Sequence, residues 1–121
     1  MSHEAQRNDE IQQCITDCQN CAAGCLETMQ HCLMLGGQHA AAPHITLLAD
    51  CAEICQTSGN FMLRGSEFHA DACRACAVVC HACDDSCRRI GADDETMRAC
   101  ADACRKCAES CERMAGATAQ R

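Results

Sequence analysis

Cysteine spacing is the feature that most limits how this chain can fold. The 121-residue sequence contains 16 cysteines, and within four groups almost every step between them is three or four residues. Such steps return to the same face of an α-helix, so each group marks one face of one helix. The four groups are Cys14, Cys18, Cys21, Cys25 and Cys32; Cys51 and Cys55; Cys73, Cys76, Cys80, Cys83 and Cys87; and Cys100, Cys104, Cys107 and Cys111.

Glycine and proline residues lie between these cysteine groups. Gly36, Pro43, Gly65 and Gly91 fall where helices are expected to end or begin, and Gly116 follows the last cysteine group. These positions predict helices near residues 9–35, 43–64, 67–90 and 94–115. Connections this short force neighbouring helices to run antiparallel. We therefore expect a single all-α domain over residues 1–121, an antiparallel up-down-up-down four-helix bundle with its cysteine stripes facing the interior.

The composition limits both the core and the partners. Leu, Ile, Val and Phe total 15 residues, whereas there are 21 alanines and 16 cysteines, so methyl groups and thiols must line most of the interior. A net charge of −7 and an aromatic content of 2% argue against nucleic-acid binding. The sequence contains no run of about 20 uncharged apolar residues, which is the length needed to span a membrane. The N-terminal segment MSHEAQRNDE is acidic where a secretory signal would be basic, so we expect a cytoplasmic protein.

Several kinds of protein use many cysteines. Buried thiols can pack as small hydrophobic groups, although aliphatic side chains fill a helical seam better and oxidise less readily. A disulfide or redox protein made of helical hairpins is a second possibility, but neighbours within one helix do not readily reach disulfide geometry. A helical module that binds Zn(II) or an Fe–S cluster is a third, yet such sites usually gather their cysteines from turns around one point.

A helical line of thiols suits a soft ion of low coordination number. Thiolates and thioethers favour Cu(I), and two sulfurs bound to one linear ion lie about 4.5 Å apart, within reach of residues i and i+4. Each CxxxC pair can therefore act as a clamp, and Cys32 and Cys73 would complete sites between helices. The clamps are Cys14–Cys18, Cys21–Cys25, Cys51–Cys55, Cys76–Cys80, Cys83–Cys87, Cys100–Cys104 and Cys107–Cys111. No acid, base and nucleophile are gathered in the pattern, which indicates storage or buffering of many Cu(I) ions, not an enzyme.

The cysteine runs resemble those of a known family. CxxxCxxCxxxC from Cys14 to Cys25 and from Cys100 to Cys111, and CxxCxxxCxxCxxxC from Cys73 to Cys87, are similar to the cytosolic copper storage proteins. The resemblance implies a homotetramer of four-helix bundles in a bacterial cytosol, each holding many Cu(I) ions inside. It also implies a role in copper homeostasis, by protection against copper toxicity or by supply to copper enzymes. The second helix departs from the pattern, with Ser58 and Met62 where further thiols could stand.

An antiparallel bundle brings a second kind of ligand to one end. Met62, His69 and Met114 would gather there beside Cys14 and Cys111. Thioethers and neutral imidazole bind Cu(I) without losing a proton, so we expect Met62, His69 and Met114 to be further metal ligands at an entrance. At the opposite end, His44 also follows its cysteine stripe and could reverse the assignment. We expect His81 at the surface, and His3, His31 and His39 in solvated or loop positions.

Two further apolar stripes indicate self-association. The second helix carries Leu47, Ile54 and Phe61 at intervals of seven, away from its cysteines, and the first helix carries a comparable set. That set is Ile15, Ala22, Leu26, Met29 and Leu33. A small bundle would not leave such faces in water, so we expect them to pack against another subunit. The alternative is that these residues widen the internal seam, the buried contact between the helices of one chain.

Overall fold

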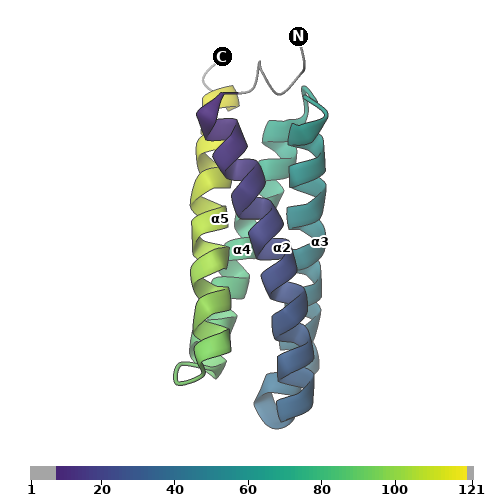
Figure 1. Ribbon diagram of the computed structural model, residues 1–121, viewed down its shortest axis with the longest axis vertical. Helices are drawn as coiled ribbons and strands as arrows, with labels where there is room; N and C mark the ends of the chain where they lie inside the picture. Colours follow the sequence, from purple (N-terminus) through teal and green to yellow (C-terminus); the bar gives the residue numbers. More distant parts are fainter. Residues whose placement is uncertain (1–7, 120–121) are drawn as a thin grey trace.

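The chain folds into four long helices that alternate in direction. The computed structural model describes residues 8–119, with side chains described to residue 116. Its elements are α2 (Asp9–Leu35), the 3₁₀ helix η1 (Gly37–Ala40), α3 (Ala42–Leu63), α4 (His69–Ile90) and α5 (Glu95–Ala119). The predicted all-α four-helix bundle is confirmed (Figure 1). We call the end where α2 begins and α5 ends the upper end, and the opposite one the lower end. His3, the first seven residues of the acidic N-terminal segment and both limits of the predicted domain lie outside the described residues.

Local capping explains three of the helix boundaries in the described part of the chain. The Asn8 side chain accepts a hydrogen bond from the Ile11 amide at 2.8 Å, and the Asp94 side chain accepts one from the Met97 amide at 2.9 Å. Gly36 ends α2 with a φ of 74°, in the left-handed region that glycine adopts without strain. The third helix begins at residue 69, two residues later than expected, because residues 67 and 68 form a turn. Gly116 does not end α5, which continues to residue 119.

The centre of the bundle is built from thiols and small apolar groups. All 16 cysteines are buried, and Ile15, Leu48 and Met97 are among the few large side chains that are fully enclosed. Ile15, expected on an outer face of α2, is buried within this single chain. For this residue the alternative interpretation, a wider internal seam, is the correct one. None of the helices in the described part of the chain has the length and apolar character needed to cross a membrane.

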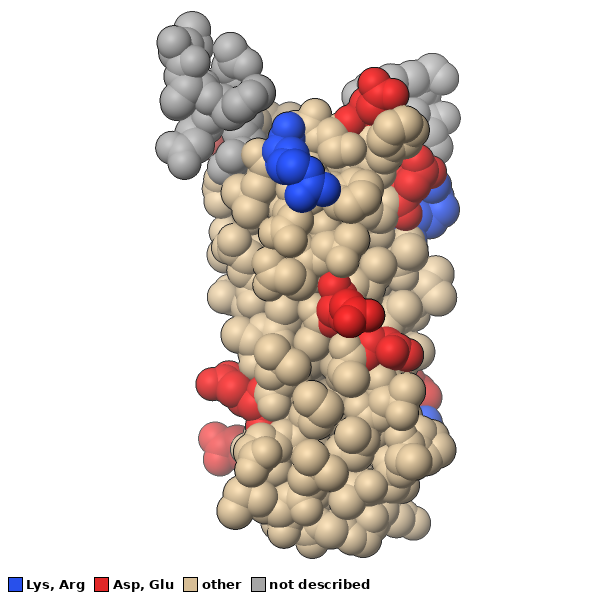
Figure 2. Space-filling view, turned by 90° about the vertical axis from the view of Figure 1, so that its right-hand side faces the viewer, with Lys and Arg blue, Asp and Glu red and all other residues tan. Residues whose placement is uncertain are grey.

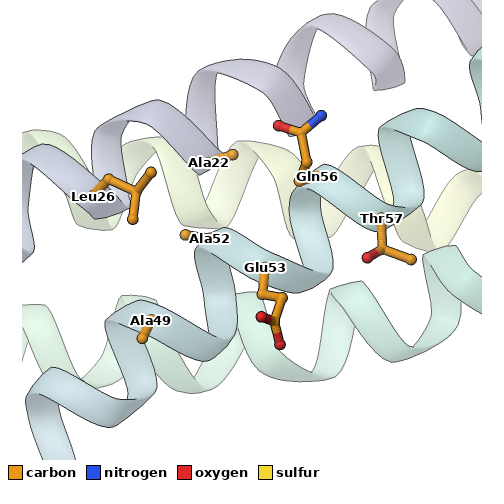
Figure 3. A pocket seen from close by; sticks show the side chains of 7 residues that line it. All are labelled: Ala22, Leu26, Ala49, Ala52, Glu53, Gln56 and Thr57. Carbon is orange, nitrogen blue, oxygen red and sulfur yellow. The ribbon is translucent and has the colours of Figure 1, made fainter.

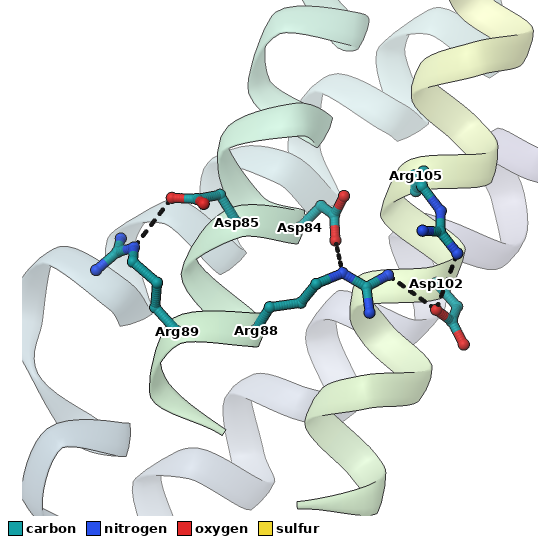
Figure 4. Close-up of polar contacts among 6 residues, drawn as sticks. All are labelled: Asp84, Asp85, Arg88, Arg89, Asp102 and Arg105. Carbon is teal, nitrogen blue, oxygen red and sulfur yellow. Dashed lines mark hydrogen bonds and ion pairs between the residues drawn. The ribbon is translucent and has the colours of Figure 1, made fainter. Parts of the chain in front are cut away.

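Charged side chains connect the outer surfaces of α4 and α5. Arg88 contacts Asp84 of its own helix at 2.6 Å and Asp102 of α5 at 2.9 Å, while Arg105 lies 3.5 Å from the same Asp102 (Figure 4). Arg89 and Asp85 form a separate pair at 2.9 Å. Exposed ion pairs of this kind each contribute about 0–1 kcal/mol, so they support the packing without deciding it.

A buried carboxylate connects α2 to α5. Asp17 is 3% exposed and accepts a hydrogen bond from the Ser110 hydroxyl on α5. Its other oxygen accepts from Gln13 Nε2 at 2.9 Å and lies 3.7 Å from Lys106 Nζ. Because these groups satisfy the buried carboxylate, separating α2 from α5 would remove its Ser110 and Lys106 partners.

Replacing Asp17 should therefore cost more than replacing an exposed aspartate. We expect Asp17→Ala to lower the free energy of unfolding of the metal-free protein by about 1–3 kcal/mol, since it leaves Ser110 without its acceptor. Asp102→Ala, the matched control on the surface, should cost less than about 1 kcal/mol. Urea unfolding followed by circular dichroism measures both. Equal losses in the two variants would contradict a special role for the buried pair.

Candidate metal site

The thiols meet inside the bundle at van der Waals contact. Representative Sγ–Sγ distances are 3.5 Å for Cys55 and Cys80 and 4.0 Å for Cys21 and Cys25. These exceed the roughly 2.05 Å of a disulfide bond. All 16 cysteines, each of which lies in the described part of the chain, are free and buried. The interior therefore presents unlinked thiols in close contact, as a soft metal ion requires.

The contacts join into one continuous file of sulfur atoms. It starts near the upper end, where Cys14 Sγ lies 3.7 Å from Cys111 Sγ, and reaches Cys25 and Cys100, 3.9 Å apart, in the lower half. Its members in order of contact are Cys14, Cys111, Cys18, Cys107, Cys55, Cys80, Cys51, Cys104, Cys25 and Cys100. The file draws on all four helices, so ions bound along it would cross-link the bundle.

Groups of four thiols recur along this file and overlap. In one group Cys21, Cys25, Cys51 and Cys104 have sulfurs within 4.8 Å of one another, and Cys21 and Cys51 belong equally to a second group with Cys55 and Cys80. A tetrahedral ion with four thiolates of its own would compete with its neighbour for these shared sulfurs. Overlapping groups are better suited to ions of low coordination number that share bridging thiolates.

The predicted clamps within single helices are only part of the arrangement. Cys76 and Cys80 do contact one another, at 3.7 Å. The sulfurs of Cys51 and Cys55, by contrast, lie 3.7 and 3.5 Å from that of Cys80 on α4. Spacing along one helix could not reveal these partners, because they depend on how α3 and α4 pack.

The upper end contains the methionines and the histidine expected there. Met62 and Met114 are buried, and the Cys73 thiol donates to Met62 Sδ at 3.9 Å. His69 is half-buried, and its Nδ1 donates to the Ser66 carbonyl at 2.9 Å. The Ser58 hydroxyl donates to the Ala72 carbonyl at 3.0 Å, so it links α3 to α4 instead of extending the thiol file.

The lower end holds a cluster that the sequence pattern indicates only in part. Cys32 Sγ lies 3.6 Å from His44 Nε2 and 3.3 Å from Met97 Sδ, and His44 Nδ1 lies 2.8 Å from Ser86 Oγ. The sequence indicates His44 only as an alternative to the upper end, and it does not single out Met97 as a ligand. Their positions on the cysteine stripes were the available signal.

Two other histidines frame this end. His31, expected to be solvated, is half-buried, and its Nε2 lies 2.8 Å from an Asp94 oxygen. That hydrogen bond lowers the pKa of Asp94. His39 lies in η1, and its Nε2 is buried without a hydrogen-bond partner. His81, expected at the surface, is exposed and lies 3.2 Å from Glu112.

The surroundings of Cys32, Cys80 and His44 favour the neutral forms of these three groups. Burial raises the pKa of the Cys32 thiol from 9.0 to about 11. Hydrogen bonding with Cys107 and other thiols, together with burial, raises the pKa of Cys80. Burial lowers the pKa of His44, which keeps its imidazole neutral. These thiols therefore remain protonated near pH 7, and a bound cation must displace their protons.

Comparisons with known proteins agree on one family. The model of the family described as copper storage protein (Csp) matches residues 7–116. A solved structure of the Nmul_A1745 protein from Nitrosospira multiformis is 45% identical, with a TM-score of 0.86, and covers 92% of this chain and 99% of its own. Cu(I)-bound BsCsp3 from Bacillus subtilis is 34% identical, with a TM-score of 0.81, over 88% of this chain and 99% of its own.

A third similar structure carries copper in known number. It is a cytosolic copper storage protein from Streptomyces lividans with five coppers, 28% identical, with a TM-score of 0.78. The match covers 89% of this chain and 93% of that protein.

Alkaline pH should destabilise the metal-free protein. The pKa of Cys32 is raised from 9.0 to about 11, so its stabilising contribution is complete below pH 9 and is lost as the pH rises through 11. We expect the urea midpoint, measured anaerobically with reductant, to fall across this range. Cys32→Ala should show a smaller fall, because it removes one of the titrating groups. A midpoint that stays constant to pH 11 would contradict the raised pKa.

Proposed function

Because this chain belongs to the copper storage protein family, we propose that it takes up many Cu(I) ions per molecule and holds them among its interior thiols. The observation that carries the proposal is the continuous file of buried sulfurs, with contacts such as Cys55–Cys80 at 3.5 Å and Cys25–Cys100 at 3.9 Å. Two sulfurs that share a three-coordinate ion lie about 4.0 Å apart when each metal–sulfur bond is about 2.3 Å. The metal-free spacing is therefore close to what bound ions need.

The proposed ligands are the 16 interior cysteines, together with two methionines and a histidine at the upper end. They are Cys14, Cys18, Cys21, Cys25, Cys32, Cys51, Cys55, Cys73, Cys76, Cys80, Cys83, Cys87, Cys100, Cys104, Cys107 and Cys111, with Met62, His69 and Met114. The 3.9 Å contact between Cys73 and Met62 supports a thioether contribution at this end. His69 would use Nε2, because its Nδ1 is engaged with the Ser66 carbonyl.

The competing functions fit the interior less well. Zn(II) prefers four ligands of its own, whereas neighbouring groups here share Cys21 and Cys51. A redox role would use Sγ pairs poised to form disulfides, but central sulfurs such as those of Cys51 and Cys80 have several near neighbours and no single partner. A store that fills by bridging makes use of all these contacts at once.

We also propose that the store works in the cytoplasm. Its thiols must stay reduced to bind Cu(I), and the cytosol keeps thiols reduced while secreted compartments oxidise them. The 16 free cysteines, several within 4 Å of another sulfur, would be exposed to oxidation elsewhere. Binding would exchange thiol protons for Cu(I) without any electron transfer.

The outer face of α2 and α3 supports assembly into a homotetramer. A hollow between these helices is lined by Ala22, Leu26, Ala49 and Ala52, with Glu53, Gln56 and Thr57 along α3 (Figure 3). Leu26 is 53% exposed and Leu33 is 51% exposed, while Leu47, Ile54 and Phe61 are half-buried. The centre of the lower half of the face in Figure 2 carries no charged side chain. We propose that further copies of this chain cover this surface.

Titration with Cu(I) tests the store directly. Under anaerobic, reducing conditions we expect uptake on the order of one ion per thiol, whereas Zn(II) would saturate near four ions per chain. Unbuffered solution should acidify as thiols lose their protons.

Cys51→Ala with Cys55→Ala should lower the capacity by about one or two ions without unfolding the metal-free protein. Ser58→Ala on the same helix is the matched control, because that hydroxyl donates to a backbone carbonyl. Saturation at only a couple of Cu(I) ions would refute the store.

A charge on the proposed interface should separate the subunits. Leu26→Asp places a carboxylate on an exposed apolar position beside the hollow, and burying an unpaired charge there opposes association. We expect the unmodified protein to sediment as a tetramer and the variant as a smaller species. Val78→Asp, at a 67% exposed position on α4, is the control and should leave the tetramer intact. A monomeric unmodified protein would contradict the assembly.

A further inference from the structure

A groove opens on the flank of the bundle between α2 and α5. Its volume is about 360 Å³, and its lining residues all come from these two helices. It is separate from the hollow between α2 and α3 that we propose as a subunit interface. Cys100 is the one cysteine among the residues that line it. The flank of the bundle therefore has an opening beside a single thiol of the interior.

Small residues keep this groove open. Gly24 of α2 and Ala99 and Ala103 of α5 line it, and none of them has a side chain larger than a methyl group. A Cβ added at Gly24 would meet no atom of another helix within 4 Å. A glycine inside a helix is less stable than alanine by about 0.5–1 kcal/mol. The chain therefore carries a residue that weakens α2 at the place where the groove is open.

Thr28 brings an unpartnered polar group to the groove. Its side chain is 2% exposed, and its hydroxyl makes no hydrogen bond within the described residues. Among the buried side-chain nitrogen and oxygen atoms of the described residues, only His39 Nε2 lacks both a partner and contact with solvent. The Thr28 hydroxyl therefore keeps contact with solvent, through the groove that Thr28 lines. It is free to bind a polar group of a molecule seated there.

Cys100 is the thiol that borders both the interior and the groove. It is 4% exposed, whereas each of the other cysteines is 0 or 1% exposed. Its Sγ lies 3.9 Å from Cys25 Sγ, so it also belongs to the thiol file. A thiol must be partly exposed to react with small molecules, and structural buried cysteines are inert. Cys100 is therefore the member of the file that a reagent from the flank can reach.

The groove distinguishes molecules by their charge. Glu27 and Glu95 line it and are exposed, and none of its lining residues is basic. The whole chain carries a net charge of −7, which adds to this local negative field. A small molecule with an ammonium group is therefore attracted to the groove, and one with a carboxylate or sulfonate group is repelled.

We propose that the groove between α2 and α5 is a mixed-disulfide site, in which Cys100 reacts with a small disulfide that carries an ammonium group. The Cys100 sulfur, after losing its proton, attacks one sulfur of the disulfide. A new S–S bond forms as the S–S bond of the reagent breaks, and the departing thiolate takes up a proton. Cys100 is oxidised and one half of the reagent is reduced, so the electrons balance.

This modification would regulate the store reversibly. A capped Cys100 sulfur can no longer share an ion with Cys25, so the capacity for Cu(I) should fall by about one ion per chain. A reducing thiol reverses the exchange and restores the ligand. This consequence rests on the proposed function, whereas the reaction of Cys100 itself does not.

Two methanethiosulfonate reagents with opposite terminal charges test the site. One ends in an ammonium group and the other in a sulfonate, and each transfers its thiol half to a cysteine as a mixed disulfide. The metal-free protein is treated anaerobically after removal of reductant, and tandem mass spectrometry locates the adduct. Each rate is divided by the rate with a small free thiol. We expect the first adduct at Cys100, and a normalised rate about tenfold higher for the ammonium reagent.

Variants of the groove separate its role from general exposure of the core. Gly24→Leu fills open space and favours the helix, so it should keep the fold and slow labelling of Cys100 about tenfold. Ala23→Leu, at the exposed neighbouring position outside the groove, is the matched control and should leave the rate unchanged. Glu27→Gln with Glu95→Gln should remove most of the preference for the ammonium reagent. Circular dichroism verifies the fold of each variant.

Three results would overturn the site. They are first labelling at another cysteine, an unchanged rate in Gly24→Leu, and equal normalised rates for the two reagents. Failure of the proposed store gives a different result, because the unsubstituted protein would then take up no more than a couple of Cu(I) ions while Cys100 still reacted first.

Discussion

Contact between thiols of different helices is the interaction on which the rest of this molecule depends. Sulfur atoms such as those of Cys18 and Cys107, 3.6 Å apart, pack the interior of a chain that has few large apolar residues. In the metal-free protein these thiols act as small apolar groups linked by weak hydrogen bonds. The raised pKa values of Cys32 and Cys80 keep those two thiols protonated near pH 7. The same contacts become metal bridges once protons leave, so packing and ligand geometry are a single arrangement.

Because the same thiols both pack the core and bind metal, polar contacts between helices matter here. The buried Asp17–Ser110 pair connects α2 to α5, and the Ser58 hydroxyl connects α3 to the Ala72 carbonyl of α4. Such contacts hold neighbouring helices in register before any ion binds. Ions along the file would then cross-link all four helices and stabilise the bundle by mass action.

The two ends of the file differ chemically. The upper end offers thioethers, with Met62 in contact with Cys73 and Met114 buried nearby. The lower end offers an imidazole held by Ser86 and a thioether that touches Cys32. A store with two unlike ends can admit or release ions at one of them, which a uniform line of thiolates could not do selectively.

The sequence alone determined which residues share a helix face and where most helices begin and end. Helical periodicity and capping are local, so cysteine steps of three and four residues, Gly36 and Pro43 sufficed for the bundle and its cysteine-lined interior. Only the tertiary structure decided which sulfurs are neighbours, because Cys14 and Cys111 are 97 residues apart and their contact depends on how the helices rotate and slide against one another. The same packing buried Ile15, aligned Ser86 with His44 and brought Met97 to Cys32, since no local pattern encodes the axial offset between two helices.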